Sequence, residues 1–210
     1  MREQPLWRPS LEQVAITNMT RFANDASSRW RRSFDDYAGL HQWSVEAPEE
    51  FWTSIWEWTG VIGTGSIDPV VLNAGQMPGA RWFPEVRLNF SRNLLRRQDS
   101  APALIFQAED KVTRSLSHAE LYRQVAGLAD ALQQAGIVPG DRVCGFMPNM
   151  PETVVAMLAS AAIGAVWSSC SPDFGVQGVL DRFGQISPRV LFSADGYWYN
   201  GKVHNSLEKL

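Results

Sequence analysis

The sequence predicts an α/β protein, with a helical amino-terminal cap followed by the start of a parallel, doubly wound sheet. Between residues 102 and 193, apolar strands alternate with helices over short joins, which is the pattern of a parallel sheet covered by helices on both faces. The first 66 residues instead carry helix-start signals and an aromatic stripe at helical spacing. We therefore expect two domains, residues 1–66 and residues 67–210.

Three helices are predicted in the cap. Ser10 can cap a helix that runs to about Ala26, and Ser33 can cap a second helix that ends near Trp43. Pro48 suits the first turn of a third helix, because its missing N–H is not needed there.

One face of the third helix is aromatic. Its stripe consists of Phe51, Trp52, Ile55, Trp56 and Thr59. A core-facing stripe is the ordinary interpretation, and a contact surface for another subunit is the alternative. Six of the nine tryptophans precede residue 60. These side chains either pack within the protein or form a contact surface for a partner.

Short elements follow the cap. Residues 60–65 are glycine-rich and predict a linker, residues 70–72 a short strand, residues 80–84 a turn and residues 89–97 a short helix. Two further strands, over 103–107 and 112–116, are predicted to form a hairpin with polar turn residues Glu109 and Asp110.

The parallel sheet is predicted after a capping box at Ser117 and Glu120, which opens the preceding helix. Asn149 can cap the helix that follows the first parallel strand, with Pro151 in its first turn. The expected order is strand 143–147, helix 151–164, strand 165–168, helix 178–186 and strand 190–193. The last strand leaves an open sheet edge, which invites a partner.

Three loops follow the strand ends, where open parallel sheets bind ligands. They are residues 148–151, 169–175 and 195–202. The middle loop carries two hydroxyls, a thiol and a carboxylate, and either caps the next helix or lines a ligand cleft. The last loop combines aromatic rings, glycines and a lysine, and can stack on a purine beside a phosphate or form an ordinary surface turn.

Hydroxyl or thiol catalysis is poorly supported, because no histidine lies in these loops to act as a base. Cys144 and Cys170 lack the spacing of metal ligands and are too few for a disulfide framework, which favours a reducing compartment. No metal site is predicted.

Composition excludes several classes. A net charge of −3 and a pI near 5.6 give no basic face for nucleic acid. The longest apolar stretch, residues 153–167, is too short and interrupted for a membrane span. The start lacks the apolar core of a secretion signal, so we expect a cytoplasmic protein.

Several motifs resemble one enzyme family. They are Asp36–Val45 with Pro48–Trp52, Arg81–Phe90, Gly140–Val143, Trp167–Gly175, Val179–Phe183 and Asp195–Tyr197. Asp36–Val45 with Pro48–Trp52 resembles the amino-terminal cap of acetyl- and acetoacetyl-CoA synthetases, and Arg81–Phe90 is similar to a run shared by those enzymes. Gly140–Val143 is common across the wider superfamily, and the last three motifs resemble the acetoacetyl branch. The chain is therefore similar to the acetoacetyl-CoA synthetases of the acyl-adenylate-forming, AMP-binding ligase superfamily.

The resemblance implies a reaction of ATP, acetoacetate and CoA that gives AMP, diphosphate and acetoacetyl-CoA through an acyl-adenylate, with Mg²⁺ as helper. The family's phosphate loop, its nucleotide motifs and its catalytic carboxy-terminal domain have no counterpart here. We expect an incomplete ligase domain, inactive alone and without catalytic residues, whose substrate is a small acid.

The resemblance also implies one binding site. In acetyl-CoA synthetases the matching stretch contacts CoA through arginines, and here Tyr199 and Lys202 stand in those places. The predicted CoA-contacting turn is thus Tyr199, Asn200, Gly201 and Lys202. Two alternatives stay open: a non-catalytic module that binds CoA or pairs with a subunit, and part of another short-chain acyl-CoA synthetase, such as an acetyl-CoA-like one.

Overall fold

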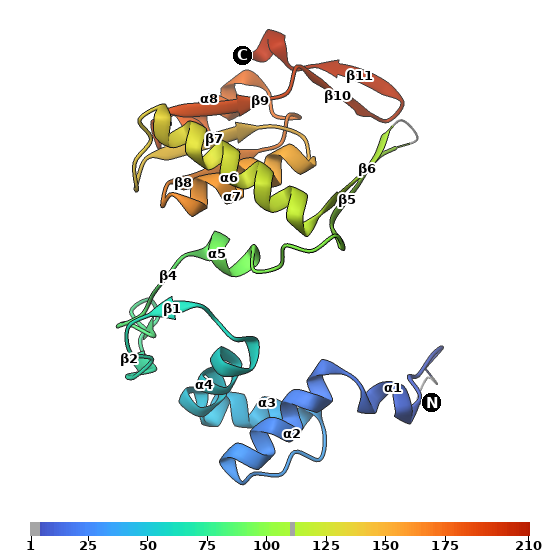
Figure 1. Ribbon diagram of the computed structural model, residues 1–210, viewed down its shortest axis with the longest axis vertical. Coiled ribbons are helices and arrows are strands. Elements are labelled where there is room, and N and C mark those ends of the chain that lie inside the picture. Colours follow the sequence, from blue (N-terminus) through green and yellow to red (C-terminus); the bar gives the residue numbers. More distant parts are fainter. Residues whose placement is uncertain (1–4, 110–111) are drawn as a thin grey trace. The chain divides into compact units, whose positions relative to one another are not determined.

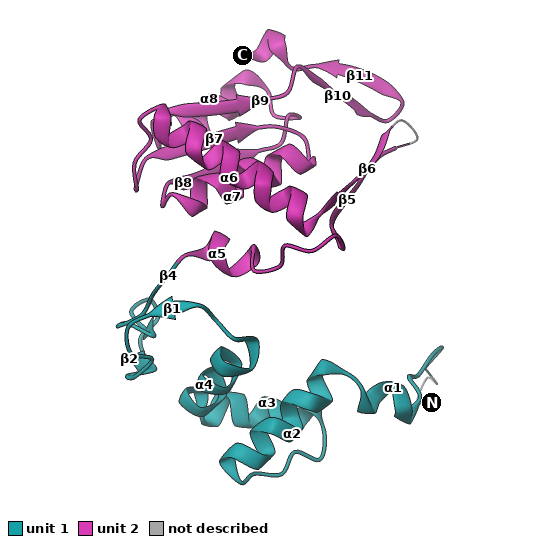
Figure 2. Ribbon diagram, in the orientation of Figure 1, with its two compact units in different colours: residues 1–88 teal, residues 89–210 magenta. Residues whose placement is uncertain are grey.

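The computed structural model describes residues 5–109 and 112–210. The chain divides into two compact units, residues 1–88 and residues 89–210 (Figure 2). The predicted division at residues 66 and 67 stays a prediction. Asp110, predicted as a turn residue, and the start of the chain at residues 1–4 lie outside the described residues.

The first unit begins with four helices: α1 Leu11–Ala15, α2 Asn18–Trp30, α3 Tyr37–Glu46 and α4 Pro48–Thr59 (Figure 1). The single helix predicted over residues 10–26 is wrong. Ser10 does cap α1, but a new N-cap at Thr17, whose side chain accepts from the Thr20 amide at 3.2 Å, starts α2.

Asp36, not Ser33, caps α3. Its carboxylate accepts the Gly39 amide at 2.8 Å, a bond at the preferred N3 position, whereas the Ser33 hydroxyl lies against Asp35. Pro48 begins α4 as predicted.

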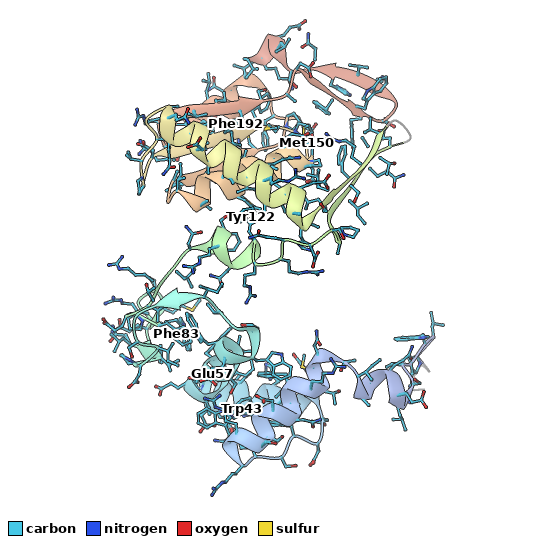
Figure 3. The ribbon with its side chains drawn as sticks, in the orientation of Figure 1. Trp43, Glu57, Phe83, Tyr122, Met150 and Phe192 are labelled. Carbon is cyan, nitrogen blue, oxygen red and sulfur yellow. The ribbon has the colours of Figure 1, made fainter. Side chains whose placement is uncertain are left out.

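The helices of this unit enclose a small core. Its buried residues are Phe22, Ala26, Leu40 and Trp43, the last of which is labelled in Figure 3. The aromatic stripe of α4 divides between two neighbours, because Phe51 and Ile55 pack on that core while Trp52 and Trp56 contact aromatic rings farther along the chain. Their partners are Trp82, at a centroid distance of 5.8 Å, and Phe83, at 4.8 Å.

Two pairs of two-residue strands complete the first unit. β1 Gly63–Thr64 pairs with β4 Arg87–Leu88, and β2 Val71–Leu72 pairs with β3 Arg81–Trp82, all antiparallel. The strand at β2 is confirmed. The linker predicted over 60–65 and the turn predicted over 80–84 are wrong where they contain strand residues, because such short pairings leave no alternation in the sequence.

The second unit opens with α5 Phe90–Leu94 and the hairpin of β5 Pro102–Ala108 and β6 Val112–Ser117. Helix α6, His118–Gln134, follows. Its predicted capping box is confirmed, since the Ser117 hydroxyl accepts from the Glu120 amide and the Glu120 carboxylate accepts from the Ser117 amide.

The predicted parallel sheet is confirmed. Its strands are β7 Arg142–Phe146, β8 Val166–Cys170 and β9 Val190–Ser193, in the order β8-β7-β9. The crossover helices are α7 Pro151–Ala162 and α8 Val176–Phe183. Asn149 does not cap α7, because Met150 holds the N-cap position and makes no side-chain bond there.

Helices cover both faces of this sheet, as the doubly wound class requires. On one face Val143 packs with residues of α6 and α7, including Val125 and Leu158. On the other face Cys144 and Phe146 pack with Cys170 and Phe183. Among the described residues, no helix is long and apolar enough to cross a membrane.

The chain ends in β10 Gly196–Tyr199, β11 Lys202–Asn205 and the 3-10 helix η1 Leu207–Lys209. The loop predicted over 195–202 is wrong, because these residues form most of an antiparallel hairpin that is separate from the parallel sheet. Asn200 and Gly201 make its two-residue turn, with φ of 51° and 71°, the backbone of a tight hairpin turn.

Candidate functional site

A cavity of about 1030 Å³ lies in the second unit, at the carboxyl ends of β7 and β8. All three loops predicted to meet there contribute to its lining: residues 147–150, 169–173 and 196–199. The sequence therefore located three walls of the cavity. A fourth wall, the β5–β6 hairpin, was missed, because nothing in its sequence signals that a hairpin distant along the chain folds over the strand ends.

The hairpin wall is fastened to α7 by an ion pair. The Arg114 guanidinium donates to both carboxylate oxygens of Glu152, at 2.7 and 2.8 Å, and lies 5.5 Å from the Phe106 ring centroid. This hydrogen bonding from Arg114 lowers the pKa of Glu152 below its usual value. Arg114 lines the cavity but is engaged in this structural pair.

A second wall depends on Asp173. Its carboxylate accepts the Tyr197 hydroxyl at 2.8 Å and the Ser171 hydroxyl at 3.0 Å. These two bonds, Tyr197 first, lower the pKa of Asp173, while partial burial and the carboxylate raise the pKa of Tyr197. The Tyr197 ring also stacks on His204, with centroids 5.0 Å apart.

The interpretation of this loop as a helix cap is wrong. The N-cap of α8 is Gly175, which has no side chain to offer, and Asp173 serves hydroxyl donors instead. The Lys209 ammonium donates to the carbonyls of Pro172 and Phe174, at 2.7 and 3.4 Å. The loop is therefore held from two sides and lines the cavity, in line with the cleft interpretation.

The four residues of the predicted CoA-contacting turn are adjacent in the hairpin, but they differ in their contacts. Tyr199 lines the cavity and is 62% exposed. Tyr199 and Lys202 face each other across the hairpin, with Asn200 and Gly201 between them. The Gly201 amide donates to the Glu109 carboxylate at 3.2 Å, which links this turn to the β5–β6 hairpin. Lys202 is exposed.

The site holds no activated nucleophile among the residues that the structure describes. Burial raises the pKa of Cys144 to about 11 and also raises that of Cys170, so both stay protonated thiols at neutral pH. Over residues 5–109 and 112–210, no three acidic, histidine or cysteine side chains gather as metal ligands. The cavity lining offers hydroxyl, carboxylate, guanidinium and aromatic groups that could contact a ligand.

Two family models match the sequence. The model described as acetyl-coenzyme A synthetase N-terminus matches residues 37–94, and the model described as AMP-binding enzyme matches residues 90–209. The chain belongs to the AMP-binding enzyme family. The two matches meet close to the point where the compact units divide.

Similar proteins agree with this family. The acetoacetyl-coenzyme A synthetase of Rhizobium meliloti (strain 1021) is 52% identical over 95% of this chain and 31% of that protein. The acetoacetyl-CoA synthetase of Xenopus tropicalis is 40% identical over 100% of this chain and 31% of that protein. The solved acetoacetyl-CoA synthetase from Streptomyces lividans matches with a TM-score of 0.91 at 44% identity, over 99% of this chain and 32% of that one.

These relatives confirm the resemblance found in the motifs. They also set its extent, because the chain spans about a third of the length of the curated relatives it matches. The matches to the Xenopus tropicalis and Streptomyces lividans proteins cover 100% and 99% of the chain, so they include both compact units.

Proposed function

We propose that this chain supplies the amino-terminal part of an acetoacetate–CoA ligase, which converts ATP, acetoacetate and CoA to AMP, diphosphate and acetoacetyl-CoA through an acyl-adenylate. The observation that carries the proposal is the 52% identity to an acetoacetyl-coenzyme A synthetase over 95% of the chain. A cavity at the strand ends, where ligands of open α/β sheets bind, supports it.

Within that enzyme, the chain's own task is to bind CoA at the Tyr199–Lys202 turn. The Gly201 amide donates to the Glu109 carboxylate, so it can serve an anion, and the next residue, Lys202, adds a positive charge. A backbone amide beside a cation is a donor set that fits a phosphate. The exposed Tyr199 ring offers a stacking surface for a purine. CoA would supply the thiol that accepts the acyl group.

The remaining residues of the site orient and shield the ligand. Asp173 and Tyr197 hold the hairpin against the 169–175 loop, and Arg114 and Glu152 hold the opposite hairpin against α7. These contacts keep the cavity walls in place, which limits the entropy lost when a ligand binds. For ATP and Mg²⁺ the described residues offer no phosphate-cradling glycine-rich loop and no cluster of metal ligands.

A chimeric enzyme tests the proposal. This chain would replace the matching 200-residue stretch of the Rhizobium meliloti synthetase, with the unaltered parent as control. The expected result is acetoacetate-dependent AMP release comparable with that of the parent. A chimera that folds and binds ATP but releases no AMP would overturn the ligase proposal.

A different acid is the second candidate, favoured by a relative named malonamoyl-CoA synthetase vrtB from Penicillium aethiopicum, 36% identical over 99% of this chain. Competition between acetoacetate, acetate and malonamate in the natural full-length enzyme would distinguish the substrates.

If the chain binds CoA but the chimera is inactive, a non-catalytic CoA-binding or subunit-pairing module is the better account. The proposal places the protein in the cytoplasm, which its two free cysteines support.

A further inference from the structure

The tip of the β10–β11 hairpin is held by a hydrogen bond to a side-chain carboxylate. The Gly201 amide, 92 residues along the chain from Glu109, donates to the Glu109 Oε2 at 3.2 Å. In a two-residue hairpin turn this amide points away from the ladder, so it is available to an outside acceptor. Figure 1 shows the hairpin reaching toward the β5–β6 hairpin, which carries that acceptor at its end.

The base of the same hairpin is fastened differently. Tyr197 donates to Asp173 at 2.8 Å, and the Ser206 amide donates to the Asp195 carbonyl at 2.9 Å. These bonds connect neutral or backbone donors to fixed acceptors within the fold. A change of partner at the tip therefore leaves the base and its cavity wall in place.

The Glu109 carboxylate occupies a donor set suited to phosphate. A phosphate favours a backbone amide beside a cation, and here the Gly201 amide is followed by Lys202. A carboxylate and a phosphate at one amide would repel each other. Arg114 lies on the same hairpin as Glu109, but its guanidinium is paired with the Glu152 carboxylate.

We propose that Glu109 is an internal competitor for the phosphate of the ligand. Its carboxylate holds the Gly201 amide until a ligand phosphate replaces it, and the tip contact between the two hairpins then opens. The inference rests on the proposed CoA-contacting turn and adds to it a residue that lowers affinity for the phosphorylated ligand.

Calorimetric titration with CoA tests the competitor. The proteins are the unaltered chain, Glu109→Gln and, as a control with the same charge change, Glu85→Gln, an exposed residue of the first unit. Glutamine keeps the size of Glu109 but removes the charge, so CoA should bind Glu109→Gln about fivefold more tightly. Glu85→Gln should bind CoA as the unaltered chain does.

The Gly201 amide resonance gives a readout that needs no ligand. It should move in Glu109→Gln, stay in place in Glu85→Gln, and move when CoA is added to the unaltered chain. Measurable CoA binding that is equal in, or weaker for, Glu109→Gln overturns the inference alone. Absence of CoA binding in all three proteins overturns the proposed CoA-contacting turn, and the inference with it.

Discussion

The Tyr197 hydroxyl donates to the Asp173 carboxylate at 2.8 Å and so joins the β10–β11 hairpin to the loop after β8. The hairpin shares no strand pairing with the parallel sheet. Its position over the cavity therefore depends on side-chain contacts such as this one. A ligand that touches both segments would bind most tightly when they are already held together.

Removing this hydroxyl should loosen the hairpin. In Tyr197→Phe we expect faster amide hydrogen exchange across residues 196–205. The local opening free energy should fall by about 1 kcal/mol, the usual contribution of one hydrogen bond. The control is Tyr122→Phe on α6, whose ring is labelled in Figure 3 and is not part of the cavity lining. Equal protection of the hairpin in both variants would show that the bond does not hold it.

The same bond gives a pH dependence. Hydrogen bonds from Tyr197 and Ser171 lower the pKa of Asp173 in the folded chain. A lowered carboxyl pKa stabilises the fold above the unfolded value of about 3.9, and this contribution is lost as the pH falls through the folded pKa. In urea unfolding at pH 6, the unaltered chain should have a higher free energy of unfolding than Asp173→Asn. This difference should shrink as the pH falls toward 3. A difference independent of pH would contradict the assignment.

Asn89 should matter to stability more than its exposed neighbours. Its amide nitrogen donates to the carbonyls of Ala161 and Ala162, at 3.1 and 3.0 Å, while its oxygen caps α5 by accepting the Arg92 amide. Asn89→Ala should cost about 1–3 kcal/mol of unfolding free energy. Asn89→Ser keeps a cap but loses the reach to α7, so it should recover only the capping share, measured by urea unfolding.

The cysteines should resist alkylation in the folded chain. Burial raises the pKa of Cys144 to about 11 and raises that of Cys170, and the thiolate is the reactive form. At pH 8 iodoacetamide should modify neither residue until urea unfolds the protein, as mass spectrometry would show. Rapid labelling of the folded chain would mean that one thiol is accessible and ionised.

Local signals predicted much of the fold. The apolar runs of β7 and β9 marked two strands of the parallel sheet, and the capping box at Ser117 marked the start of α6. Errors arose at helix caps, because Asp36 takes the N-cap position of α3 in place of Ser33, and Thr17 caps a second helix after the one that Ser10 begins. Spacing in the sequence does not reveal which side chain makes the capping bond.

The site was predicted in part for a similar reason. Loops that follow parallel strands must meet at one sheet edge, so three walls of the cavity could be expected. The sequence predicts a loop where the β10–β11 hairpin lies, because Tyr197, Trp198 and Tyr199 do not alternate with polar residues. The contact between Glu109 and Gly201 spans 92 residues and has no local pattern at all.

The most direct test of the account is calorimetric titration of CoA into the 210-residue chain and into Lys202→Gln, with Arg123→Gln on α6 as the control for lost charge. The account predicts saturable CoA binding that Lys202→Gln weakens about tenfold, the scale of one hydrogen bond to a charged group, and that Arg123→Gln leaves unchanged. CoA binding that is absent, or unaffected by Lys202→Gln, would contradict the claim that the Tyr199–Lys202 turn receives CoA.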